Sequence, residues 1–89
     1  MIIPKEIKVG KRKIPVSKIK GMKLIRGKYV WDQKIVISDE YTQKQQYETF
    51  WHEVTHAILH EMKHPLNRDE KFVTRFAQLL TQAITTAKL

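Results

Sequence analysis

Residues 43–63 read QKQQYETFWHEVTHAILHEMK, and the apolar side chains of this segment recur every three or four positions. This period is typical of one face of an amphipathic helix. Pro65 follows the segment, and a proline ends a helix because it lacks the backbone donor and its ring clashes with the preceding turn. The sequence therefore predicts one helix over residues 43–63, whose apolar face comprises Tyr47, Phe50, Trp51, Val54, Ile58 and Met62.

The first 38 residues have the pattern of strands joined by tight turns. Glycines at positions 10, 21 and 27 and an Asp-Gln pair at 32–33 interrupt short stretches that are rich in β-branched residues. The predicted strands are residues 5–9, 11–19, 22–31 and 34–38.

A second helix is predicted over residues 67–87. Asn67 is a suitable N-cap, and Glu70 three positions later completes a capping box. The apolar side chains again recur at helical spacing: Phe72, Val73, Phe76, Leu79, Leu80, Ala83 and Ile84. The chain is thus expected to be α+β, with a small antiparallel or mixed β-sheet followed by two packed α-helices.

Composition narrows the class of protein. A chain of 89 residues and 10.6 kDa has room for one core, so residues 1–89 are expected to form a single domain. The absence of cysteine excludes disulfides and thiolate metal sites. No apolar run approaches the roughly 20 residues that span a bilayer, and the N-terminal residues lack the apolar core of a signal peptide. We therefore expect a cytoplasmic protein of a cell or of a phage-infected host, with no membrane partner.

The positive charge is concentrated in the predicted strands. The net charge is +8; residues 1–38 hold eleven Lys or Arg against two acids, a balance of +9, and residues 39–89 hold six against seven, a balance of −1. A basic surface attracts nucleic acid or an acidic protein partner. Lysines on the solvent face of strands also prevent edge-to-edge pairing, which is a purely structural explanation of the same residues.

The predicted helix over 43–63 contains His52-Glu53-Val54-Thr55-His56, which is the pattern HExxH. Residues four apart lie on one helical face, roughly 6 Å apart at Cβ, so the two imidazoles can converge on one metal ion. Glu53 projects beside them, on the polar side that the apolar stripe leaves free. Its carboxylate can take a proton from a water activated by the metal. The pattern predicts metal ligands at His52 and His56 and a catalytic acid–base at Glu53.

A catalytic zinc site needs a third protein ligand and an open position for water. His60 lies two turns, roughly 12 Å, from His52 along the helix axis and cannot share the ion. His64 is a candidate, although the chain lacks the glycine turn of the pattern HExxHxxGxxH. Asp69 and Glu70 are the other candidates, because a helical hairpin would bring them back across the first helix. The phase of the apolar stripe favours Glu70 over Asp69.

Together these segments resemble a known family. The runs His52-Glu53-x-x-His56-x-x-Leu59-His60 and Glu70-x-x-Val73-x-x-Phe76-Ala77-x-x-Leu80 are similar to the motifs of ImmA/IrrE-type metallopeptidases, which are minimal gluzincins, and of small phage-encoded zincins. The resemblance covers roughly residues 35–84. It implies a zincin-like fold with zinc on His52, His56 and Glu70, and Glu53 as the catalytic acid–base.

The chain also departs from this family. Thr55 replaces a glycine that is frequent within the HExxH motif, and Thr74 stands where the family usually has an acid or an amide. The side chain that should orient a zinc-binding histidine is therefore not identified by the resemblance.

The sequence predicts a zinc-dependent metallopeptidase that hydrolyses a protein or peptide substrate, as a monomer or a small homo-oligomer. The alternative is a basic module that binds nucleic acid or protein and carries a structural or vestigial zinc site.

Overall fold

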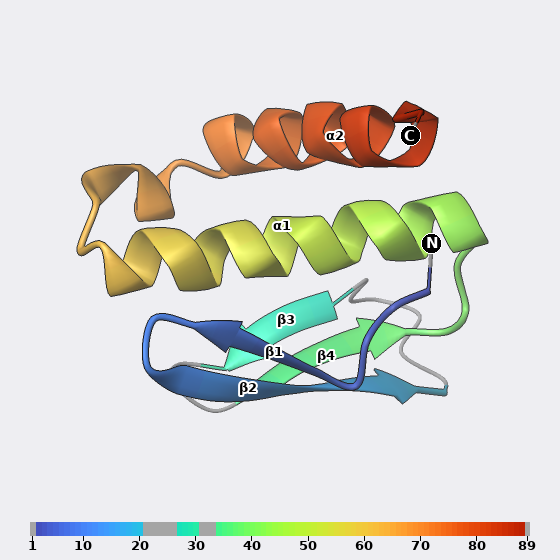
Figure 1. Ribbon diagram of the computed structural model, residues 1–89, viewed down its shortest axis with the longest axis horizontal. Helices are drawn as coiled ribbons and strands as arrows, with labels where there is room; N and C mark the ends of the chain where they lie inside the picture. The colour runs from blue at the N-terminus through green and yellow to red at the C-terminus, as the bar shows by residue number, and fades with distance from the viewer. Residues whose placement is uncertain (1, 21–26, 31–33, 89) are drawn as a thin grey trace.

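The computed structural model describes residues 2–20, 27–30 and 34–88. These ranges form four strands, two long helices and a short 3-10 helix: β1 (Glu6–Val9), β2 (Arg12–Ile19), β3 (Gly27–Val30), β4 (Lys34–Ser38), α1 (Gln43–Glu61), η1 (Pro65–Arg68) and α2 (Glu70–Thr86). The sheet, α1 and α2 form successive layers, with α1 in the middle (Figure 1). The predicted α+β class, with a mixed sheet followed by two packed helices, is confirmed.

The four strands agree with the predicted ones to within one residue wherever both can be compared. Of the predicted strand 22–31, residues 27–30 form β3, whereas 22–26 and 31 lie outside the described residues, as does the predicted turn at 32–33. None of the described helices is both long and apolar enough to cross a bilayer.

The sheet has the order β1-β2-β4-β3, with β2 and β4 parallel and the other neighbours antiparallel. Strand β2 changes partner along its length, because residues 12–15 pair with β1 and residues 16–19 pair with β4. A proline normally suits an edge strand, since it cannot donate to a ladder. Pro15 fits within this central strand because it stands just before the ladder with β4 begins.

Helix α1 lies on the sheet through a continuous apolar core. Full burial of a side chain as large as Phe50 stabilises the fold by about 1.5–3 kcal/mol. The core joins sheet residues Val9, Ile14, Val16, Ile35 and Ile37 to Phe50, Val54 and Ala57 of α1. The last two residues of the predicted stripe, Ile58 and Met62, are exposed and do not join this core. Ala57 enters the core instead.

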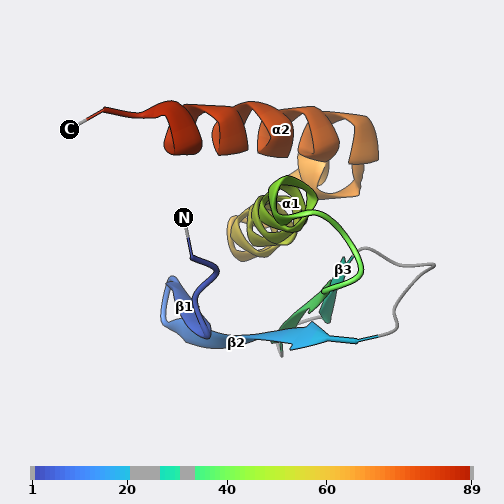
Figure 2. The same ribbon diagram turned by 90° about the vertical axis from the view of Figure 1, so that its right-hand side faces the viewer.

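Helix α2 packs on the opposite side of α1 through small side chains. Val73, Ala77 and Thr81 are its buried residues. Figure 2 views α1 nearly end-on while α2 runs across it, so the helices cross rather than pair along their length. The crossing leaves part of the predicted apolar stripe uncovered, and Phe76 and Leu79 are 44% and 47% exposed.

Helix α1 begins with a capping box that Thr42 and Gln45 form. It ends at Glu61 rather than at residue 63, and Lys63 adopts a left-handed conformation with φ of 53°. The residue before a proline is disfavoured in the helical conformation, so Pro65 ends the helix early.

Helix α2 begins at Glu70, and the prediction that Asn67 is its N-cap is wrong. Asp69 is the N-cap, and its Oδ1 accepts a hydrogen bond from the Phe72 N–H at 3.0 Å. Asn67 lies in η1, which leaves its side chain available to contact α1.

Candidate metal centre

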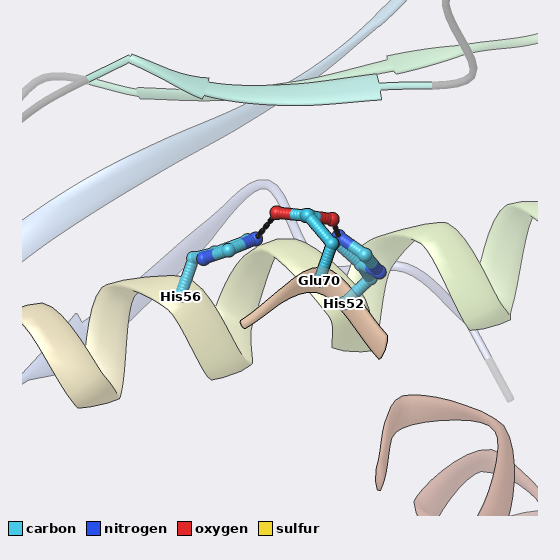
Figure 3. Close-up of side chains that lie close together, drawn as sticks. All are labelled: His52, His56 and Glu70. Carbon is cyan, nitrogen blue, oxygen red and sulfur yellow. Dashed lines mark ion pairs between the residues drawn. The ribbon is translucent and has the colours of Figure 1, made fainter. Parts of the chain in front are cut away.

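Helix α1 and the first turn of α2 bring His52, His56 and Glu70 together (Figure 3). The two imidazoles, one helical turn apart, present their Nε2 atoms to the same carboxylate. Nε2 of His52 is 3.1 Å from Oε2 of Glu70, and Nε2 of His56 is 2.8 Å from Oε1. The candidate ligand atoms all lie within 4.8 Å of one another. The three side chains form a group that could hold a metal ion.

The donor set and its spacing suit such an ion. Two ligands at about 2.0–2.1 Å from a tetrahedral ion are about 3.3 Å apart. The two histidine–glutamate contacts are close to this separation, whereas the group as a whole, whose ligand atoms lie within 4.8 Å of one another, would have to close further around an ion. The side chains of His52 and His56 are 21% and 15% exposed, whereas that of Glu70 is 67% exposed. The imidazoles are thus held by packing, and the centre opens to solvent on the Glu70 side.

A further contact orients the ring of His56. Oδ1 of Asn67 lies 2.8 Å from Nδ1 of His56. Because an amide oxygen only accepts hydrogen bonds, Nδ1–H is the donor, and a neutral ring then carries its lone pair on Nε2. A lone pair facing a carboxylate oxygen is repelled unless a cation lies between them. The arrangement therefore suits a metal cation at the centre of the group.

Asn67 is the orienting residue that the sequence analysis did not identify. The sequence pattern predicts Asn67 as the helix cap, although Asp69 offers an equally good N-cap. That second candidate was the signal that Asn67 could serve elsewhere. Such outer contacts fix the tautomer and direction of a ligating histidine.

The other candidates for the third ligand have capping roles. Nδ1 of His64 accepts a hydrogen bond from the Leu66 N–H at 3.1 Å at the start of η1. Asp69 caps α2, as described above. In the described part of the chain neither belongs to a group that could hold a metal ion. Glu70 instead turns its carboxylate to the histidines and does not close the predicted capping box.

Glu53 is buried beside His52, with 7% of the residue exposed. Both residues line a cavity of about 250 Å³ between α1 and α2, together with Glu48, Thr49, Thr74, Ala77 and Gln78. The polar side of α1 is therefore covered in part by α2, and does not simply face solvent. Glu53 therefore lies next to one of the candidate ligands, His52, on the side of α1 that faces α2.

Comparisons of the chain with protein-family models, with curated proteins and with solved structures find no match. The resemblance to minimal gluzincins therefore rests on the motifs alone and stays a prediction. What the geometry establishes is a His-His-Glu group that could hold a metal ion, with a buried carboxylate next to it.

Proposed function

We propose that this protein is a zinc-dependent metallopeptidase. The observation that carries the proposal is the convergence of His52, His56 and Glu70 from two helices, with Glu53 beside them. Imidazole and carboxylate are ligands that zinc accepts, and three protein ligands with an open position are typical of catalytic zinc. The HExxH pattern supports the same reaction, because its glutamate is the general base of metallopeptidases.

Each side chain has a separate task in this mechanism. Bound zinc would activate a water molecule and polarise the peptide carbonyl. The carboxylate of Glu53 accepts the proton of the attacking water and passes it to the nitrogen of the leaving amine. Asn67 holds the His56 ring in the orientation that leaves Nε2 available as a ligand.

The sheet offers a surface for the main chain of the substrate. Among the described strands β3 lies at an edge of the sheet, and Figure 2 shows it on the same side of α1 as the first turns of α2, which carry Glu70. An extended peptide can add to such an edge through main-chain hydrogen bonds. We propose that the substrate pairs with β3 and so passes the metal centre.

Removal of the metal should abolish peptide cleavage. Protein stripped with a chelator should not cleave a denatured protein substrate, and one equivalent of zinc should restore the activity, because the ion supplies the activated water. Gel electrophoresis and mass spectrometry of the products would measure both states. Cleavage by the stripped protein at the rate of the loaded one would contradict the proposal.

Asn67→Ala should weaken zinc binding by about 10- to 100-fold, because the ring of His56 loses the acceptor that orients it. Competition with a chromophoric chelator would measure the affinity. Asn67→Asp keeps an acceptor oxygen and should bind zinc nearly as the wild type does. This rescue separates a positioning role from general loss of structure, and equal affinity of the alanine variant would show that the contact has no such role.

A second candidate function, binding of nucleic acid or an acidic protein, rests on the β1–β2 hairpin. Lys8 and Lys13 are exposed and lie directly opposite each other. Like charges in this register destabilise the strand pair, and a bound anion would relieve the repulsion. Arg12, in contrast, pairs with Glu61 at 3.1 Å. Binding to duplex or single-stranded nucleic acid that weakens steeply with salt and ignores chelator would favour this function.

A further inference from the structure

A groove leads away from the candidate metal centre between α1 and α2. Its inner part is the cavity of about 250 Å³ that His52 and Glu53 line. Its outer part, of about 700 Å³, lies between the start of α1 and the later turns of α2. Glu48 and Gln78 line both parts, so the two adjoin each other.

The two parts of the groove differ in charge. Among the described residues that line the inner part, Glu48 and Glu53 are acidic and none is Lys or Arg. The outer part adds the cations Lys44 and Arg75. The inner part is thus a locally acidic surface in a chain of net charge +8, and it adjoins the proposed site of reaction.

Glu48 is the carboxylate of the inner part that has no task in the proposed mechanism. Its side chain is partly buried and forms no ion pair or hydrogen bond with other residues in the described ranges. It precedes His52 by four residues in α1, so the two side chains lie on the same helical face, roughly 6 Å apart at Cβ. A substrate group that binds Glu48 therefore belongs to a residue next to the bond that lies at the metal centre.

We propose that the inner part of the groove is a specificity subsite for a positively charged group of the substrate. The inference rests on the proposed peptidase function. The group is an amino or guanidino group next to the cleaved bond, on a Lys or Arg side chain or at a free peptide N-terminus. Its hydrogens would be donated to the carboxylate of Glu48, with the hydroxyl of Thr49 and the amide oxygen of Gln78 as further acceptors.

The cleavage preference of the zinc-loaded protein tests this subsite. A peptide library produced by cutting a proteome after acidic residues keeps Lys and Arg inside the peptides, and mass spectrometry reads the residues that flank each new cut. We expect Lys or Arg to be enriched about tenfold or more beside the cut, as a charged hydrogen bond provides. A second library, acetylated only at its N-termini, distinguishes a Lys or Arg side chain from a free peptide N-terminus as the bound group. If the protein removes single residues from the ends of unblocked peptides but not of acetylated ones, the bound group is the free N-terminus. If neutral residues flank the cuts as often as Lys and Arg do in both libraries, the proposal is overturned.

Substitutions of Glu48 assign the preference to this residue. Glu48→Gln should keep its zinc and lose the enrichment, and Glu48→Lys should shift the preference toward acidic residues. Glu40→Gln is the matched control, because Glu40 is an exposed acid before α1 that lines neither part of the groove. An enrichment that survives Glu48→Gln would overturn the assignment.

A binding experiment separates failure of the subsite from failure of the peptidase. The probes are N-acetyl-lysine methylamide and its uncharged counterpart N-acetyl-methionine methylamide, added to zinc-loaded Glu53→Gln protein. The subsite would be supported, even if no peptide is cleaved, by amide chemical-shift changes at Thr74 and Gln78 that occur with the lysine compound only. These changes should be absent from the double variant that also carries Glu48→Gln. Equal changes with both compounds, or none, would overturn it whether or not the protein is a peptidase.

Discussion

Glu70→Gln should remove the metal from this protein without unfolding it. Wild-type protein purified without chelator is expected to carry about one zinc per chain, and the variant close to none, since three protein ligands are the usual minimum for catalytic zinc. Elemental mass spectrometry gives both values. The side chain of Glu70 is 67% exposed, so its contacts with the two histidines contribute little to stability, at most about 1 kcal/mol. The circular dichroism spectra of the wild type and of Glu70→Gln, both without zinc, should therefore be the same.

The same comparison has a thermodynamic readout. At free zinc about 100-fold above Kd, binding stabilises the folded state by about 2.7 kcal/mol, which raises Tm by roughly 10–20 °C in a domain of this size. Only the wild type should show this rise. His60→Gln is the control, because it removes an imidazole from the same helix and should leave the zinc content unchanged. Retention of zinc by Glu70→Gln at the wild-type level would refute the ligand assignment.

Glu53→Gln should keep the zinc and lose the activity. Glutamine has nearly the size of glutamate and can still form hydrogen bonds, so it should be accepted at a position with 7% exposure. It cannot take up a proton from the attacking water, and loss of a general base lowers turnover by about 10²- to 10⁴-fold. Rates on one peptide substrate, measured together with zinc content, would show the separation.

The control for this variant is Glu61→Gln. Glu61 is also on α1, but its carboxylate pairs with Arg12 on the sheet, away from the candidate ligands. It should cleave at the wild-type rate. A comparable rate for Glu53→Gln and Glu61→Gln would mean that the proton is transferred by another group.

The sequence could predict the parts of the site that depend on a single helix. The spacing of His52 and His56 determines that they share a face, whatever packs around them. Glu70 required a further assumption, that the second helix returns across the first, and η1 sets where it does so. Asn67 could not be placed, because the 3-10 turn changes the direction of side chains relative to the continuous helix that the capping box implied.

The sequence did not reveal which apolar residues of α2 are buried. Its periodicity identifies a stripe, but the crossing with α1 selects the small residues Val73, Ala77 and Thr81. Phe76 and Leu79 belong to the predicted stripe but lie outside the contact. Crossing geometry depends on the shapes of two surfaces at once, which a pattern in one segment does not contain.

Because β2 changes partner along its length, its two halves are expected to pair at different stages of folding. The parallel ladder joins Val16 to Ile35, nineteen residues apart, whereas the antiparallel pairs of β1 with β2 and of β3 with β4 join shorter stretches. Contacts between distant residues form more slowly, so the parallel ladder should close after the two hairpins. The three candidate ligands all lie between residues 52 and 70. A metal ion bound there would therefore join α1 to α2 and would not itself tie either helix to the sheet.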